Sequence, residues 1–91
     1  MSNSKFTDAD ELFRALLREI RVDKGVTQVQ LAERLGSLQS YVSKYETGER
    51  RLDFVETTEV CDALGIDLKA FVELYRTKLA KSKSAAQKAT P

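Results

Sequence analysis

The stretch that decides the fold is 27–51, TQVQLAERLGSLQSYVSKYETGERR. Its first part places apolar residues at helical spacing on one face: Leu31, Ala32 and Leu35. Gly36 interrupts this pattern, and a second short helix follows and ends at Gly48. The second helix turns two residues inward: Val42 and Tyr45. Two short helices joined by a turn that contains glycine form a helix-turn-helix unit.

The outer face of the second helix carries four polar side chains: Gln39, Ser40, Ser43 and Lys44. Such groups can contact base edges or phosphates. Gln39 opens the helix, and its amide can accept a hydrogen bond from adenine N6 and donate one to N7. The alternative is an exposed glutamine with good helix propensity. Lys44 can reach a guanine or a phosphate. Ser43 either contacts DNA or makes no DNA contact, and its position alone does not decide between the two.

Residues 21–64 resemble the lambda-repressor-like DNA-binding domain, the XRE family of bacterial and phage regulators, and a looser resemblance covers 12–75. The resemblance implies a compact, all-α fold of five helices, with the helix-turn-helix at the second and third. The matching residues are Arg21, Lys24, Gly25, Thr27, Gln28, Leu31, Ala32, Leu35, Gly36, Gln39, Ser40, Val42, Ser43, Lys44, Glu46, Gly48, Ala63, Leu64 and Gly65.

Five further residues are predicted to contact DNA phosphates: Gln28, Tyr41, Thr47, Arg50 and Arg51. Gln28 begins a helix, whose positive dipole end attracts a phosphate, and the resemblance adds a second role in which it supports Gln39. Tyr41 should point outward and can offer its hydroxyl. The other three resemble the backbone-contacting loop of the family. The alternative interpretation is that all five are ordinary exposed polar residues.

The resemblance also implies a partly buried ion pair between Arg21 and Glu46, which would fix the second helix of the unit against its scaffold. The alternative is two independent surface charges.

One position departs from the family pattern. Leu38 stands where Ser, Thr or Asn often caps the helix that Gln39 opens, so either Ser37 caps an earlier start or the cap is lost, at a cost of about 1 kcal/mol.

Composition limits the class of protein. Ninety-one residues allow one domain, and 42% hydrophobic with 32% charged residues fits a soluble globular protein. Cys61 is the only cysteine and there is no histidine, which removes an intrachain disulfide and the commonest metal ligand and general base. We therefore expect no enzyme activity, metal or cofactor. No run approaches the ~20 apolar residues of a membrane span, so we expect a cytoplasmic protein without membrane or small-molecule partners.

The charge is unevenly distributed along the chain. The net charge is +1, but residues 1–66 carry nine basic and twelve acidic side chains, a balance of −3, and residues 67–91 carry six and two, a balance of +4. The segment 34–51 has a balance of +2. Because the local distribution matters more than the sum for nucleic-acid binding, this segment stays a candidate DNA-binding surface.

Apolar spacing predicts five helices, at about 9–24, 28–35, 39–47, 54–64 and from about 67. The expected N-caps are Thr7 or Asp8, Thr27 and Asp53. We expect the fourth helix to turn four residues inward, with its cysteine as a buried, inert thiol: Val55, Val60, Cys61 and Leu64.

The fifth helix has more apolar residues than one small core needs: Leu68, Phe71, Val72, Tyr75 and Leu79. Phe71, Tyr75 and Leu79 form a line that we expect to be the dimer interface about a two-fold axis. The alternative is that the line covers only the core of its own subunit. We divide the chain into an N-terminal arm (1–6), the DNA-binding domain (7–80) and a disordered basic tail (81–91).

The sequence thus predicts a sequence-specific transcriptional regulator of the repressor or controller type. It would insert the helix at 39–47 into the major groove of double-stranded DNA and bind a pseudo-palindromic operator as a homodimer. The alternative is a protein-interaction module or antitoxin whose main partner is another protein, which the acidic balance of 1–66 favours.

Overall fold

The computed structural model describes residues 2–89 of the chain, and the side chains of residues 8–83. Its helices are α1 (Ser2–Asp23), α2 (Gln28–Leu35), α3 (Gln39–Thr47), α4 (Phe54–Leu64) and α5 (Leu68–Ala89), and residues 2–89 contain no strand. The predicted all-α fold of five helices is confirmed. No helix in this part of the chain is both long and apolar enough to cross a membrane.

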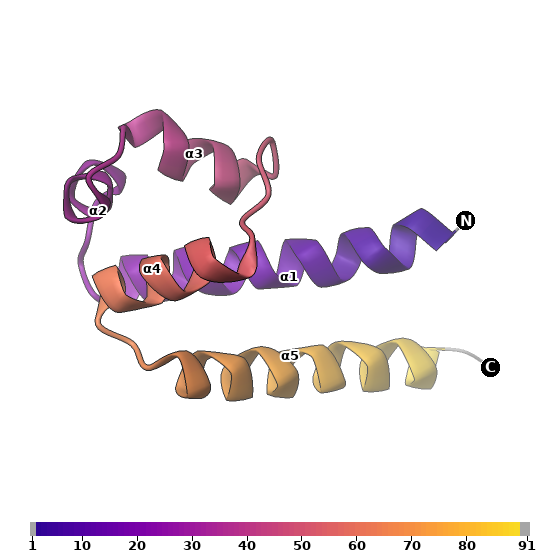
Figure 1. Ribbon diagram of the computed structural model, residues 1–91. Coiled ribbons are helices and arrows are strands. Elements are labelled where there is room, and N and C mark those ends of the chain that lie inside the picture. Colours follow the sequence, from indigo (N-terminus) through magenta and orange to yellow (C-terminus); the bar gives the residue numbers. More distant parts are fainter. Residues whose placement is uncertain (1, 90–91) are drawn as a thin grey trace.

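The two long helices form the base of the molecule. α1 and α5 lie side by side and run in opposite directions, so both ends of the chain lie on the right in Figure 1. α3 lies above α1, and α2 packs against both α3 and α4. The helix-turn-helix formed by α2 and α3 is therefore held on one side of the molecule, away from α5.

Local signals place the ends of the short helices. Thr27 and Asp53 each close a capping box, in which the cap side chain accepts from the backbone N–H three residues on and that residue's side chain accepts from the cap N–H. Gly36, with φ of 66°, provides the left-handed residue that ends α2 and starts the turn into α3. These two caps and this turn agree with the predictions.

Both long helices extend further than expected. α1 begins at Ser2 rather than near residue 9, so the expected caps Thr7 and Asp8 lie inside it. α5 continues to Ala89, through most of the predicted tail. The physical reason is that neither segment contains a proline or glycine to stop a helix. The division into arm, domain and tail stays a prediction, and residues 1, 90 and 91 lie outside the described residues.

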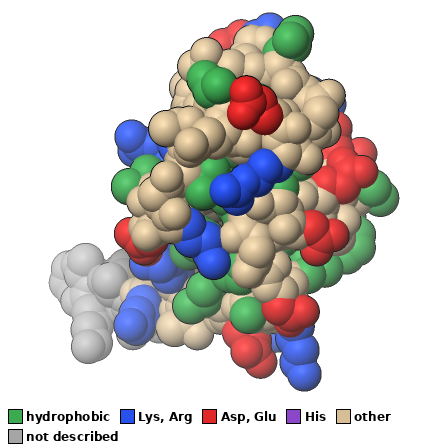
Figure 2. All heavy atoms as spheres, turned by 90° about the vertical axis from the view of Figure 1, so that its left-hand side faces the viewer, with side chains coloured by type: hydrophobic (Ala, Val, Ile, Leu, Met, Phe, Trp, Pro, Cys, Tyr) green, Lys and Arg blue, Asp and Glu red, His purple; other side chains and the backbone are tan. Residues whose placement is uncertain are grey.

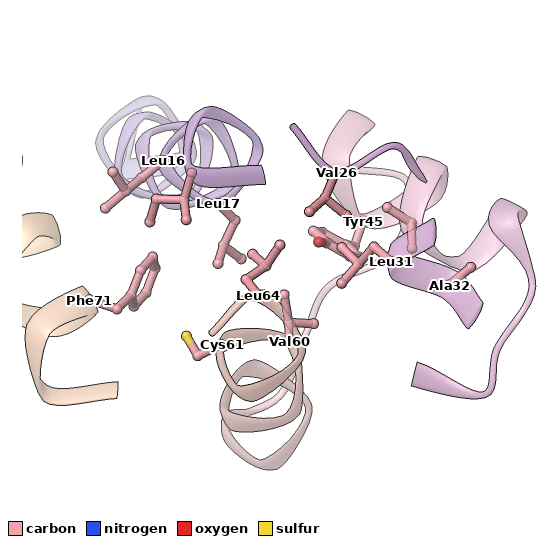
Figure 3. Packing of buried hydrophobic residues seen from close by; sticks show 12 residues of the cluster. Leu16, Leu17, Val26, Leu31, Ala32, Tyr45, Val60, Cys61, Leu64 and Phe71 are labelled. Atoms are coloured by element: carbon pink, nitrogen blue, oxygen red, sulfur yellow. The ribbon is translucent and has the colours of Figure 1, made fainter. Parts of the chain in front are cut away.

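The core lies where all five helices meet. Figure 3 shows Leu16 and Leu17 of α1 facing Phe71, with Leu64 of α4 between them and Tyr45. The buried apolar residues are Leu16, Leu17, Ile20, Val26, Leu31, Ala32, Val42, Tyr45, Val60, Cys61, Leu64 and Phe71. Because α3 contributes two fully buried residues on its inner side, its opposite side must face solvent.

One predicted core residue is not in the core. Val55 is 62% exposed. Its expected place is taken by Thr57, which is 7% exposed and donates its hydroxyl to the carbonyl of Asp53 at 2.8 Å. Two helical residues apart corresponds to ~200° of rotation, so a helix that buries Thr57 must expose Val55.

The start of α3 lacks a side-chain cap. Leu38 occupies the N-cap position, is 76% exposed and makes no side-chain hydrogen bond to the helix. Of the two alternatives that the sequence leaves open, the structure shows the second: α3 starts at Gln39 and the cap is lost. The backbone partly compensates, because the N–H of Tyr41 donates to the carbonyl of Leu38 at 3.0 Å.

We expect Leu38→Ser to raise the free energy of unfolding by about 0.5–1 kcal/mol, because its hydroxyl can accept from an N–H of the first turn. The measurement is urea unfolding, read as a higher midpoint at unchanged slope. Leu38→Ala is the matched control, since it removes the same exposed side chain without adding an acceptor. Equal stability of the Ser and Ala variants would show that the first turn gains nothing from a cap.

Candidate nucleic-acid interface

The outer face of α3 presents a row of polar side chains. Gln39, Ser40, Lys44 and Thr47 are exposed, and Ser43 is half-buried. On the inner face Val42 and Tyr45 are fully buried. The structure thus brings the four predicted base-contacting residues to one surface. Thr47 also donates its hydroxyl to the carbonyl of Lys44, one turn back, at 3.2 Å.

The C-terminal end of α3 is fastened to α1. Arg14 of α1 donates to the backbone carbonyl of Glu46 at 3.2 Å and pairs with Asp10 at 2.9 Å. Gly48 ends α3 with φ of 89°, and a Cβ there would lie 2.8 Å from the guanidinium carbon of Arg14. The left-handed conformation favours glycine, and any larger residue would also displace the end of the Arg14 side chain. Arg14 is not among the residues predicted for the site, although its spacing of four residues from Asp10 is that of a helical ion pair.

Arg21 and Glu46 form a buried, bidentate ion pair between α1 and α3. Arg21 Nε donates to Glu46 Oε2 at 2.7 Å, and Nη2 donates to Oε1 at 3.1 Å. The side chains are 9% and 3% exposed. Arg21 Nη1 also donates to the carbonyl of Val26 at 2.8 Å. Its hydrogen bond to Glu46 raises the pKa of Arg21. Removing one partner of such a pair typically costs about 3–5 kcal/mol, since it strands a buried charge.

Gln28 links this ion pair to the exposed surface. Its Nε2 donates to Glu46 Oε1 at 2.9 Å, while its Oε1 accepts from Gln39 Nε2 at 3.3 Å. The first residues of α2 and α3 are therefore neighbours, with the positive dipole ends of both helices at the same surface. A contact between Gln28 and Gln39 was implied by the family resemblance, but the continuation to Glu46 was not foreseen.

Arg50 and Tyr41 form a second cluster beside α3. The guanidinium carbon of Arg50 lies 4.8 Å from the centroid of the Tyr41 ring. The same guanidinium donates to Glu56 of α4 in a bidentate pair, at 2.7 and 3.2 Å. This hydrogen bonding raises the pKa of Arg50 and lowers the pKa of Glu56. A phosphate contact by Arg50 would therefore compete with, or share, its bond to Glu56.

The remaining predicted phosphate contacts differ in exposure. Tyr41 is half-buried and packs edge-on against Tyr45, with ring centroids 6.0 Å apart. Burial raises the pKa of Tyr41, so its hydroxyl stays a donor at neutral pH. Arg51 is exposed in the segment that follows α3.

Charge on the molecule is mixed rather than uniformly positive. Figure 2 views the left-hand side of Figure 1, the side where α2 lies, and shows basic side chains interspersed with acidic ones. This pattern agrees with the near-balanced charge of the sequence. Non-specific attraction to the phosphate backbone should accordingly be weak, because that attraction grows with the number of neutralised phosphates.

The predicted dimer line on α5 needs a correction at Phe71. Phe71 is 3% exposed and packs edge-on against Phe13 of α1, with ring centroids 5.8 Å apart. Tyr75 also packs edge-on against Phe13, with ring centroids 6.3 Å apart. Tyr75 and Leu79 are half-buried. Phe71 therefore belongs mainly to the core of its own subunit, as the alternative interpretation held, although Phe71 and Tyr75 also line the floor of a groove beside α5.

A neighbouring groove is both apolar and exposed. It has a volume of ≈ 520 Å³ and lies between α1, the start of α4 and α5. Phe54 and Val72, which line it, are 70% and 40% exposed. The exposure of Phe54 was not predicted, because a residue directly after a helix cap can point to either side. Asp53 and Arg76 give the groove one acidic and one basic edge.

Neither a metal site nor a reactive thiol is evident. Within the described residues no group of three potential metal-binding side chains comes together. Cys61 is fully buried, and burial raises the pKa of its thiol to about 11. As expected from its place in α4, it is a neutral packing residue at physiological pH.

Comparison with known proteins defines the class. A family model described as a helix-turn-helix domain matches residues 12–81. The chain is 36% identical to the solved XRE-family like protein from Pseudomonas syringae pv. tomato str. DC3000, with a TM-score of 0.79 over 85% of this chain and 94% of that one. It is 30% identical to the clp gene regulator ClgR from Corynebacterium glutamicum, with a TM-score of 0.76 over 89% and 86%.

A third similar structure, the wild-type restriction-modification controller protein C.Esp1396I, is 23% identical with a TM-score of 0.75, over 80% of this chain and 95% of its own, and supports the fold alone. No curated protein gives a match. The chain is therefore a helix-turn-helix domain of the DNA-binding transcriptional regulator type. Within this class it belongs to the XRE-like family, a non-enzymatic type of DNA-binding protein.

Proposed function

We propose that this regulator acts in the cytoplasm as a sequence-specific repressor or controller, binding a pseudo-palindromic operator as a homodimer. The observation that carries the proposal is the exposed amide of Gln39 at the start of α3, supported from behind by Gln28. A glutamine at this place can bond to two atoms of one base edge. Gene regulation by ClgR, at 30% identity, points the same way.

The small size of the contact surface supports binding as two copies. A nine-residue α3 reaches few base pairs, so useful affinity comes from two half-sites about 34 Å apart. We assign the contact between copies to the groove beside Phe54 and Val72. What supports this assignment is the 70% exposed side chain of Phe54 beside the apolar lining of the groove, together with one acidic and one basic edge, Asp53 and Arg76.

A second candidate function is a protein-interaction module that keeps the fold. The mixed charge seen in Figure 2 and the balance of −3 over residues 1–66 favour it. Against it stands the connection of Gln39 through Gln28 to a buried ion pair. Such a connection holds one exposed amide in a fixed orientation, which base recognition needs and an adaptable protein surface does not.

Gln39→Ala tests the base contact. We expect it to cost about 1–3 kcal/mol on the selected site and to relax the preference at one base pair in each half-site. Affinity for random DNA should hardly change. The measurement is in vitro selection from a random duplex library, followed by titration of the selected and random duplexes. An equal loss on both duplexes would remove Gln39 from sequence recognition.

Arg50 and Arg51 are tested by the dependence of affinity on salt. Neutralising either should weaken specific and random binding together and reduce the salt slope by about one unit. Glu56→Gln should act in the opposite direction, because it releases Arg50 from a competing carboxylate. That gain should disappear when Arg50→Gln is added. A gain that persists without Arg50 would mean that Glu56 acts only through its own charge.

The groove is tested by sedimentation at tens of micromolar. We expect the wild type to be dimeric and Phe54→Asp to be monomeric, with lost affinity for the full operator and unchanged affinity for a single half-site. Val55→Asp is the matched control, since Val55 is a neighbouring, 62% exposed residue that does not line the groove. A wild type that stays monomeric, or a dimer that tolerates Phe54→Asp, would contradict the assignment.

A further inference from the structure

Four side chains form a continuous path from the core to the outer face of α3. Arg21 donates to Glu46 at 2.7 and 3.1 Å, Gln28 donates to Glu46 at 2.9 Å, and Gln39 donates to Gln28 at 3.3 Å. The path begins at side chains that are 9% and 3% exposed and ends at an exposed one. Every donor along the path points toward Glu46.

This direction is imposed by chemistry at the buried end. The two oxygens of Glu46 already accept from Arg21 and have no proton to offer, so Gln28 must face Glu46 with its NH₂ group. A glutamine amide has one donor end and one acceptor end, so Gln28 must then turn its oxygen to Gln39. Gln39 must donate in turn, which leaves its own oxygen and its second N–H for the outer surface.

We propose that Glu46, which does not reach the surface, determines which purine base Gln39 recognises. The inference rests on the proposed function and deepens it. Adenine presents a donor at N6 and an acceptor at N7, which match the oxygen and the remaining N–H of Gln39. Guanine presents acceptors at both O6 and N7. To bind guanine, Gln39 would have to offer two donors, which breaks its bond to Gln28. Glu46 is therefore a positioning residue for adenine specificity.

Glu46→Gln should reverse the path. The new amide has only one acceptor for the two Arg21 donors. Keeping the shorter bond, from Arg21 Nε at 2.7 Å, requires that its oxygen face Nε and gives up the 3.1 Å bond from Arg21 Nη2. Its NH₂ group then faces Gln28, which must turn its oxygen inward and its NH₂ group to Gln39. Gln39 accepts that bond with its oxygen and presents both of its N–H groups outward, the arrangement that suits guanine.

The experiment is in vitro selection from a random duplex library with the wild type and three variants. The position that Gln39 contacts is first located as the one relaxed by Gln39→Ala. We expect the wild type to select adenine there. In Glu46→Gln the ratio of adenine to guanine should fall by about tenfold at that position alone. Glu33→Gln is the control, because it removes one exposed carboxylate of α2 that is outside the path.

A second variant keeps the test decisive if Glu46→Gln fails to fold. Gln28→Met leaves the ion pair intact but removes the hydrogen bonds that connect Gln39 to it. The ratio of adenine to guanine should therefore fall, while the backbone N–H groups of α2 stay in place. Weaker binding with an unchanged ratio in both variants would overturn the inference and leave the proposed function standing. A wild type that selects guanine at that position would also overturn it. A wild type that enriches no motif would overturn both.

Discussion

The buried ion pair between Arg21 and Glu46 is the interaction on which the rest of the structure depends. α3 has nine residues, and its first turn lacks a side-chain cap. An isolated helix of this length is unstable in water, so α3 is held by contacts with other elements. One guanidinium binds α3 through Glu46 and the turn before α2 through the carbonyl of Val26. One buried guanidinium of α1 thus contributes to the orientation of both helices of the unit.

The buried ion pair also explains how a chain with near-zero net charge can recognise DNA. Its carboxylate is needed to orient Gln28 and Arg21, but it is 3% exposed and buried beneath their donors. The positive charge of Arg21 offsets its field. The acidic group therefore organises the surface above it while contributing little repulsion toward phosphates. Recognition in such a protein depends more on placed hydrogen bonds than on overall attraction.

Much of the fold could be predicted because its signals are local. The starts of α2 and α4 follow from capping residues, and the ends of α2, α3 and α4 follow from glycines that adopt left-handed conformations. The prediction that Val55 lies in the core was wrong, because apolar spacing alone favours burying a valine over a threonine. Thr57 can be buried because its hydroxyl is satisfied inside its own helix. The lengths of α1 and α5 were underestimated because polar composition alone does not end a helix.

The site was predictable to the extent that it follows helical register. The exposure of Gln39, Ser40 and Lys44 follows from the burial of the opposite face. The pairing of Arg50 with Glu56 crosses the turn between α3 and α4, and no spacing rule describes the path of that turn. Phe71 was assigned to a partner because its true partner, Phe13, is far away in the sequence. Distances along a helix predict which side chains share a face, but not what that face meets.

The thiol of Cys61 can report how often the core of this small domain opens. It lies in α4 beside Phe71 and Leu64, with its pKa raised to about 11. The thiolate is the species that attacks a thiol reagent, and the closed core neither forms it at neutral pH nor exposes it. Labelling must then wait until α4 separates from α1 and α5. The labelling rate would measure how often the scaffold beneath the helix-turn-helix opens, and whether bound DNA slows that opening.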